Sequence, residues 1–502
     1  MPVLFKIAFR NLRAHKVKTL IIGLILGLGM LILVAGNSLL NTATAGIKRN
    51  YIENFTGHIM ITGSTESDIT LFGIEGAFDE SMPRIPQYFS VLEYVESHPA
   101  VVAVSPQVTG RATLQYGEDG MGFAMLFGVD PKRYFELFPN NLELVQGAFL
   151  EEGQDGIVLS EMSAQMIEGT SGQAPAVGDR VLLTASGGTV GTSIREVTVR
   201  GVFRFRNAVA QLNMVSLIDM QNLRSLVGLT VIAPSDLDLS EAEEALLGEV
   251  DEESLFGGGG EEDATEEEAL FEVALETAET SGVERSEESF VGILGDTSKR
   301  DELSQTDTGS WHYLLVRLKD TANVNRVIGE FSDYFAGEGI DVHVADWLAG
   351  AGTMAEMVYG IKNIFNLIVL IIAVVAVIII MNTLVISVSE RIAEIGTMRA
   401  IGAHKSFVRR MVTFETLMIS AVFGSAGIVI GGVLLGILNL TGLHSPSMFF
   451  QIIFGGEALH PVLSASTVAA SLGMVLGVGV LASLYPVSIA LRIQPVKAMQ
   501  TE

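Results

Sequence analysis

The 502-residue chain combines 49% apolar residues with a formal net charge of −27, and a single globular domain does not need both extremes. The two properties therefore belong to different segments, which excludes an evenly mixed soluble domain and indicates a membrane protein with an acidic domain on one side. The chain has no cysteine, so disulfides and thiolate metal sites are excluded.

The N-terminal residues 1–18 carry five basic residues and no acidic one, interleaved with apolar residues. This pattern predicts an amphipathic helix on an anionic cytoplasmic leaflet. Residues 19–41 are uncharged and, at about 1.5 Å per residue, long enough to cross a hydrocarbon core of about 30 Å. A cleaved secretory signal is the alternative, since Ala43-Thr44-Ala45 imitates a cleavage site. The apolar run, however, exceeds the roughly 7–15 residues of such signals.

The segment between the first two spans, residues 42–358, is expected to form an extracytoplasmic α+β domain. Between residues 42 and 363 the chain holds 19 Lys and Arg against 53 Asp and Glu. Alternating apolar residues predict strands, and helical spacing predicts helices. The strands are expected at 57–62, 112–115, 123–129, 157–159, 181–184, 197–205 and 312–318, the helices at 87–97, 160–168 and 324–335, and a linker from there to residue 354.

Residues 234–309 differ in composition from the rest of this domain. Residues 257–260 are all glycine, and acidic residues dominate 261–279. A segment with so few apolar residues buries too little surface to offset its ordering entropy. We expect a mostly disordered acidic insertion, and a solvated loop without a specific role is the simplest alternative.

Three further apolar runs predict membrane spans at 359–388, 411–440 and 466–491. Basic residues are concentrated in the loop 389–410 and in the tail 492–502, whereas the loop 441–465 has none. Because Lys and Arg mark cytoplasmic loops, both termini and residues 389–410 are expected in the cytoplasm, with the α+β domain outside.

The loop 389–410 contains an amphipathic stretch. Its apolar positions are Ile392, Ile395, Met398 and Ile401, and its charged positions are Glu390, Arg391, Glu394 and Arg399. The spacing predicts a short helix from Glu390 to Arg399 that stops near Gly402. Gly396 would permit close backbone approach, and Ile395 with Met398 would form a face for docking on a partner. An ordinary solvated turn is the alternative.

Small residues at four-residue spacing mark faces on which membrane helices can approach closely. The pairs are Gly23 with Gly27, Gly427 with Gly431, Gly432 with Gly436, and Gly473 with Gly477. Glycine is common in membrane helices, so each pair alone carries little information, but together they predict a packed, oligomeric bundle. Glu415 either faces protein or lies at the membrane edge with its carboxylate reaching water.

Intrinsic enzymatic activity has no support in the sequence. The chain contains no Gly-Lys dipeptide, so it has no phosphate-binding loop of the form G-x-x-x-x-G-K-[ST] and is not expected to hydrolyse ATP itself. The H-E-x-x-H and G-x-S-x-G patterns are also absent. We expect no metal site, no cofactor in this chain and no nucleic-acid partner.

Residues 390–403 resemble the E-R-x-x-E-I-G-x-x-R-A-x-G-A segment of the FtsX/MacB-like ABC transporter permeases. That superfamily includes the lipoprotein-releasing Lol permeases and macrolide exporters. The resemblance covers nearly the whole chain outside the acidic insertion. It continues at 8–12, at Asn382-Thr383, at Glu415 with Gly424, Gly427 and Gly431, at 485–498, and in the outer segment at 128–131, 147, 156–160 and 177–181.

The resemblance implies a permease subunit with a MacB-like periplasmic core, driven by two copies of an ABC-type ATP-binding subunit that bind ATP and Mg. ATP-driven closure would push a coupling segment, and stiff helices near 41–55 and 354–363 would carry the displacement to the outer domain. A second permease copy or a paralogue and the lipids of the inner (plasma) membrane would be further partners. The residues implied in ATPase coupling are Glu390, Arg391, Glu394, Ile395, Gly396, Met398, Arg399, Ala400 and Gly402.

Within the superfamily, residues 57–59, 214–217 and 315–319 look most like the lipoprotein-releasing LolC/LolE-type branch, which implies lipoprotein cargo. Residues 185–192 lack the enlarged, proline-bearing hook of the permease that recruits a periplasmic carrier, so docking of a carrier in that manner is in question. One alternative is a MacB-like exporter acting with a periplasmic adaptor. Another is an FtsX-like regulator of a cell-wall hydrolase, although the outer domain of those members is much smaller.

Overall fold

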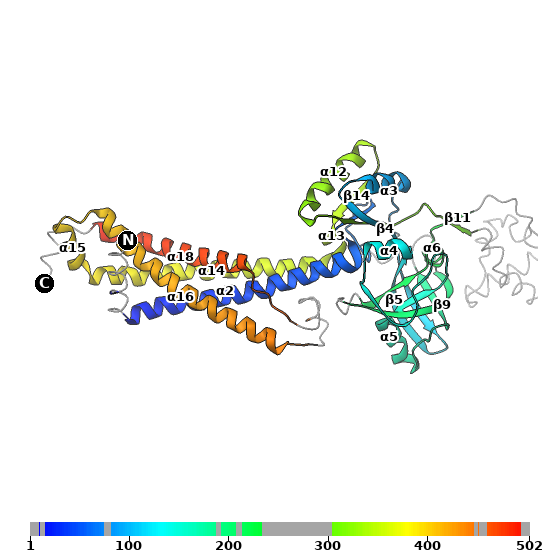
Figure 1. Cartoon of the computed structure of the whole chain (residues 1–502), viewed down its shortest axis with the longest axis horizontal. Helices are drawn as coiled ribbons and strands as arrows, with labels where there is room; N and C mark the ends of the chain where they lie inside the picture. Colours follow the sequence, from blue (N-terminus) through cyan, green and yellow to red (C-terminus); the bar gives the residue numbers. More distant parts are fainter. Residues whose placement is uncertain are drawn as a thin grey trace, which may run out of the picture.

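The computed structural model describes residues 10, 16–74, 82–186, 192–206, 213–232, 304–445, 450 and 459–492. Figure 1 shows an elongated molecule with a long helical bundle joined at one end to a mixed α/β region, which we call the outer domain. Four helices are long and apolar enough to cross a membrane, and the outer domain contains both helices and strands, so the predicted fold class is confirmed.

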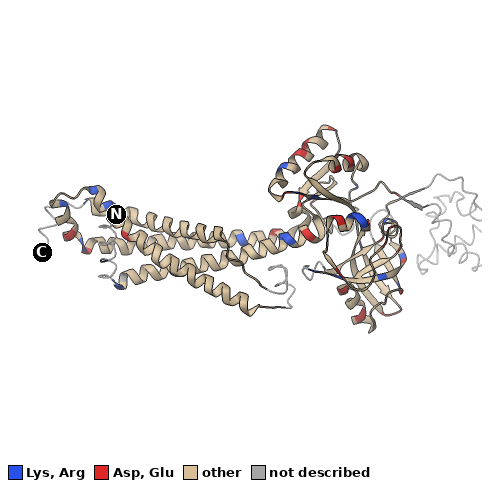
Figure 2. Ribbon diagram, viewed as in Figure 1, with Lys and Arg blue, Asp and Glu red and all other residues tan. Residues whose placement is uncertain are grey.

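The four membrane helices extend beyond the predicted apolar runs. They are α2 (Lys16–Tyr51), α14 (Thr353–Glu390), α16 (Lys405–Thr441) and α18 (Ala465–Arg492). The 36 residues of α2 make a helix about 54 Å long, well beyond a hydrocarbon core of about 30 Å. Figure 2 shows the middle of the bundle without charged residues, while charges mark both of its ends. The predicted helix 1–18 and the tail 493–502 lie almost entirely outside the described residues.

The outer domain is built on one ten-stranded sheet. Its strands are β1 (Ile59–Gly63), β4 (Val101–Tyr116), β5 (Gly120–Val129), β6 (Leu142–Gly147), β7 (Ile157–Ser160), β8 (Arg180–Ser186), β9 (Thr192–Phe205), β10 (Val215–Ile218), β13 (Tyr313–Leu318) and β14 (Val342–Asp346). Two separate pairs are β2 (Ile69–Thr70) with β3 (Gly73–Ile74) and β11 (Thr230–Ile232) with β12 (Ser304–Thr306). The helices of this domain are α3 (Tyr88–Ser97), α4 (Pro131–Leu137), α5 (Glu161–Ser171), α6 (Met220–Leu226), α12 (Val324–Gly337) and α13 (Trp347–Ala351).

Six of the strands form a closed ring. The pairings run from β4 to β5, β10, β7, β9 and β8, and β8 pairs again with β4. Closure removes the free edges that an open sheet would expose. The long strand β4 also pairs through Val101–Gln107 with β13, which leads to β1 and β14. β4 therefore links the closed ring, which we call the barrel, to a second lobe formed by β13, β1 and β14. The helices α3 and α12 cover this lobe (Figure 1).

All five residues of β1 are buried. Since successive side chains of a strand point to opposite faces, both faces of β1 are covered. Ile59 and Ile61 pack in the cluster that includes α3 and α12. Met60 packs on the opposite side, in a second cluster that includes the ends of the two long helices. The sheet is therefore held between its own helices and the membrane helices.

Both long helices enter the core of the outer domain. The second cluster contains Ala43, Ile47 and Tyr51 of α2, Ala355 and Val358 of α14, and the strand residues Phe127, Phe203, Leu217 and Tyr313. The helix α2 ends in one π-helical turn, Ile52–Thr56, whose Phe55 is only 1% exposed. The predicted helical extensions near 41–55 and 354–363 are thus confirmed, and they end inside protein rather than in solvent.

Two boundary predictions are wrong. The expected linker before residue 354 contains β14 and α13, because a short strand completes the sheet beside β1 and Asp346 caps the next helix through the Leu348 N–H at 2.9 Å. The acidic insertion was expected to reach residue 309, but β12 pairs with β11 and belongs to the fold. The rest of the insertion, 233–303, and most of the hook region, 187–191, lie outside the described residues.

Candidate functional site

The candidate site lies at the end of the bundle opposite the outer domain, which we call the distal end (Figure 1). Here α14 ends at Glu390, and a short helix, α15 (Ile392–Ala400), precedes α16. Arg391 separates the two helices with φ −106° and ψ 15°, and its N–H still bonds back to the carbonyls of Val388 and Ser389. The predicted helix start at Glu390 is therefore wrong by two residues, because Glu390 completes the last turn of the preceding span.

The helix α15 ends in a left-handed turn. Gly402 has φ +108°, which L side chains rarely adopt. The Ala403 N–H donates to the Met398 carbonyl at 3.0 Å, and the Gly402 N–H donates to the Arg399 carbonyl at 3.2 Å. These two bonds satisfy carbonyls that the end of the helix would leave free, in the Schellman arrangement. The helix thus stops where the sequence predicts, and the chain reverses into α16.

The apolar face of α15 packs on the chain itself. Ile395 is 1% exposed and lies in a cluster with Val388, Val408, Met411, Val412, Val487 and Ala490. Met398 is partly buried against the same cluster. The expectation that Ile395 enters a groove on a partner is therefore wrong, because the ends of α16 and α18 come alongside and bury it. The same expectation for the partly buried Met398 stays a prediction.

Arg391 ties α15 to the third membrane helix. Its Nη1 lies 3.2 Å from Glu415 Oε2, and its Nε lies 3.2 Å from Glu394 Oε2. The side chains of Arg391 and Glu415 are only 11% and 13% exposed, whereas Glu394 is 67% exposed. Of the two alternatives for Glu415, the structure supports the one in which its carboxylate faces protein.

Arg399 contacts the last membrane helix. Its Nη1 donates to the Leu491 carbonyl at 3.3 Å, next to the end of α18. A cation at a helix C-terminus is favourable because it satisfies a free carbonyl and the negative end of the helix dipole. Arg399 was expected at the rim of a partner groove, but this bond directs it toward its own chain.

The outward face of α15, with the turn that follows it, combines small, polar and apolar residues. Its exposed residues are Ala393, Glu394, Thr397, Ala400, Ile401 and Gly402. Ile401 is 88% exposed and is the one large apolar side chain so exposed among residues 388–412. The sequence pattern includes Ile401 in the apolar series but does not separate it from Ile395. In the structure the two differ in exposure, since Ile395 is 1% and Ile401 88% exposed.

The predicted glycine pairs divide into two groups. A Cβ on Gly23 would meet the Phe423 ring at 2.4 Å, one on Gly427 would meet the Gly27 carbonyl oxygen at 2.3 Å, and one on Gly431 would meet Val34 at 3.4 Å. These residues form a close seam between α2 and α16. A Cβ on Gly432 would lie 3.5 Å from Leu463, whereas one on Gly436, Gly473 or Gly477 would meet no neighbouring element within 4 Å among the described residues. Sequence spacing missed Gly36, Gly424 and Gly479, which contact Phe365, Val475 and Ser420.

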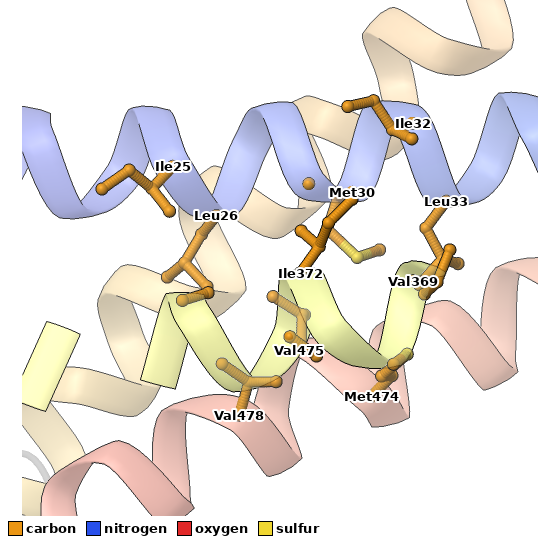
Figure 3. A pocket seen from close by; sticks show the side chains of 13 residues that line it. Ile25, Leu26, Met30, Ile32, Leu33, Val369, Ile372, Met474, Val475 and Val478 are labelled. Atoms are coloured by element: carbon orange, nitrogen blue, oxygen red, sulfur yellow. The ribbon is translucent and has the colours of Figure 1, made fainter. Parts of the chain in front are cut away.

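One hollow inside the bundle is lined by apolar residues. Figure 3 shows it between α2, α14 and α18, where Met30, Ile372 and Val475 approach one another. Its volume is about 50 Å³ and its lining residues are apolar. Within the described ranges, no cluster of His, Asp or Glu could hold a metal ion. At the distal end, the contacts among the described residues are apolar packing, hydrogen bonds and ion pairs.

Comparisons with known proteins agree with this architecture. Residues 19–249 match the model of the MacB-like periplasmic core domain, and residues 366–495 match the model of the FtsX-like permease C-terminal region. The ABC transporter permease YtrF of Bacillus subtilis is 35% identical over 129 residues, which are 24% of this chain and 28% of YtrF. The macrolide export ATP-binding/permease protein MacB of Rhodopirellula baltica is 24% identical over 242 residues, 48% of this chain and 28% of that protein.

Among solved structures, the periplasmic region of MacB from Actinobacillus actinomycetemcomitans is similar, with 13% identity, a TM-score of 0.28, and coverage of 60% of this chain and 91% of that one. The chain spans little more than a quarter of the two curated relatives named above. The two family models match successive parts of the chain, one over the first membrane helix and the outer domain as far as β11, and one over most of the remaining membrane helices. In two successive parts, the chain is therefore similar to the FtsX/MacB-like ABC transporter permeases.

Proposed function

We propose that this chain is the membrane subunit of an ABC transporter in which ATP hydrolysis by separate partner subunits moves the outer domain mechanically. The observation that supports this most directly is the continuity of α2 and α14, which run from the bundle into the core of the outer domain. Force applied at the distal end has an unbroken helical route to that core. Transport of cargo through the bundle is not required.

The docking surface for the ATP-binding subunits is the outward face of α15, with Ile401 as its apolar anchor. Losing a buried apolar anchor at a protein interface typically costs on the order of 1–4 kcal/mol. We therefore expect Ile401→Asp to abolish co-purification of the ATP-binding subunit. Lys405→Ala, at the exposed first residue of α16, is the matched control and should bind normally. Normal binding by Ile401→Asp would rule out this surface.

Two copies of the ATP-binding subunit, which hold ATP and Mg, would serve a pair of permease chains. Gly436, Gly473 and Gly477 have open space where a side chain would lie. We propose that the helix faces that carry these glycines contact a second copy of the chain or a paralogue. Leucine at Gly477 should then reduce pairing in chemical cross-linking, with little effect on folding of the single chain. Unchanged pairing would place the second chain elsewhere.

We place the protein in the inner membrane, with the outer domain on the periplasmic side. The chain lacks cysteine, so single cysteines at Ser97 and Ser406 can report on topology without background labelling. Both positions are exposed, one in α3 and one at the distal end. An impermeant thiol reagent on intact spheroplasts should label position 97 and leave position 406 unmodified. The reverse pattern would invert the topology.

Lipoproteins of the inner membrane are the cargo we favour, on the resemblance of residues 57–59, 214–217 and 315–319 to the lipoprotein-releasing branch. The test is release of an acylated lipoprotein from proteoliposomes that contain the complex and ATP. A non-acylated form of the same protein is the control. Release that does not depend on the acyl chains would exclude this cargo class.

Drug export with a periplasmic adaptor is the second candidate, because several relatives carry the name macrolide export ATP-binding/permease protein. Efflux of a macrolide from cells that express the complex, together with recovery of an adaptor protein after mild detergent extraction, would favour it. If lipoprotein release and macrolide efflux are measured in the same strain, the two candidates give opposite results.

A further inference from the structure

The distal end contains one partly buried ion-pair network that crosses a helix break. Arg391 contacts Glu394 on one side and Glu415 on the other, each at 3.2 Å. Glu394 lies on the outward face of α15, and Glu415 lies within α16 near its first turns. One guanidinium therefore connects the surface that would meet a partner with the third membrane helix.

The backbone around α15 is poorly suited to transmit force by itself. The chain leaves the helical conformation at Arg391 and takes the left-handed conformation at Gly402, so α15 is bounded by a break at each end. Its apolar contacts in the distal cluster are non-directional and tolerate small sliding movements. A paired guanidinium is directional, since its donors have fixed geometry.

The helix that receives this contact is packed tightly on α2. The seam at Gly427 and Gly27 leaves no room for a methyl group, because a Cβ would lie 2.3 Å from the opposing carbonyl oxygen. The helix α2 in turn ends in the core of the outer domain, at Tyr51 and Phe55. Arg399 contacts a different helix, α18, through the Leu491 carbonyl.

We propose that Arg391 is the positioning residue through which movement of α15 reaches α16 and then α2. This inference rests on the proposed function and adds the route of transmission. Its partner in that role is Glu415, whose largely buried carboxylate lies 3.2 Å from the guanidinium. Replacing either residue should separate ATP hydrolysis from movement of the outer domain while the ATP-binding subunit remains attached.

The test uses the assembled complex in detergent and compares hydrogen exchange of the outer domain with and without ATP and vanadate. In the parent, strands of the outer domain should change their exchange rates when nucleotide is trapped. Arg391→Gln and Glu415→Gln should keep at least half of the ATP hydrolysis and lose at least nine-tenths of the exchange difference. Arg410→Gln, at an exposed position of α16, is the control and should behave as the parent.

A second variant separates transmission from folding. With cysteine at both Arg391 and Glu415, a short bifunctional thiol reagent can restore the link between α15 and α16 in an otherwise cysteine-free chain. We expect cross-linking to recover most of the exchange difference and single cysteines to recover none. The proposal is overturned if the glutamine variants keep the difference, if they lose the ATP-binding subunit, or if the link restores nothing. A parent that binds no ATP-binding subunit would instead refute the proposed function, and this inference with it.

Discussion

The two ends of the helical bundle are built in different ways. At the outer end, α2 and α14 share a large buried cluster with the sheet, and aromatic rings such as Phe55 and Phe205 pack 4.7 Å apart. At the distal end, α15 is held by a small apolar cluster, one hydrogen bond from Arg399 and the ion pairs of Arg391. Because the buried cluster is larger at the outer end, we expect α15 to be displaced at lower cost than the outer domain can be separated from its helices.

The largest expected effect is a difference in stability between these two ends. Phe55→Ala removes a fully buried ring at the outer junction and should cost about 3–5 kcal/mol, whereas Ile395→Ala should cost about 2–4 kcal/mol. Both tryptophans, Trp311 and Trp347, lie in the outer domain, so their fluorescence reports unfolding there. Ile395→Ala should leave that signal unchanged and increase proteolysis near α15.

Equal loss of the fluorescence signal in both variants would contradict the comparison, because it would mean that the two ends unfold as one unit. Val102→Ala, at a side chain that is 56% exposed on β4, is a control for the substitution itself and should change neither measurement.

Acid should weaken the outer domain through His312. This imidazole is buried, and its Nδ1 accepts a hydrogen bond from the Thr109 N–H at 3.2 Å. Burial, with a smaller contribution from Arg84, lowers its pKa to about 3. The unfolded chain binds a proton below about pH 6.5 and the folded domain does not, so the free energy of unfolding falls as pH drops from about 6.5 toward 3.

His312→Asn keeps an acceptor for the Thr109 N–H but cannot titrate. Between pH 7 and pH 4.5 the parent should lose about 2–3 kcal/mol more stability than this variant, measured by tryptophan fluorescence in denaturant. Parallel pH profiles of the two proteins would show that His312 is not the titrating group.

The four spans and seven of the ten strands of the large sheet could be predicted because their patterns are local. The predicted strand at residues 312–318, for example, is β13 in the structure. The partners of a side chain are not local. The sequence predicts Ile395 as a docking residue, but the structure buries it against Val408 and Val487. The ion pair of Glu415 with Arg391 joins residues on either side of a turn, and no spacing rule predicts it. The short β14 was missed because five residues carry too little pattern, and only pairing with β1 stabilises them.

The smallest effect is expected where the outer domain carries its acidic insertion. The strands β11 and β12 pair from Thr230 with Thr306 to Ile232 with Ser304, which closes the fold before the insertion begins. After β12, Asp307 accepts from the Gly309 N–H at 2.9 Å and from the Ser310 hydroxyl, and Arg84 lies 3.7 Å away. The base of the insertion is therefore fixed by residues outside 233–303.

Replacing residues 236–303 by a Gly/Ser linker of about half the length should change stability by less than about 1 kcal/mol, because halving a flexible loop alters its closure entropy by only about 0.6 kcal/mol. Expression and recovery of the ATP-binding subunit should also be unchanged, since the acid-rich composition offers little apolar surface to the core. The matched comparison extends the replacement to residue 309, which removes β12 and Asp307 and should destabilise the domain measurably. If the shorter replacement already causes proteolysis or loss of assembly, the insertion stabilises the outer domain, which would contradict this prediction.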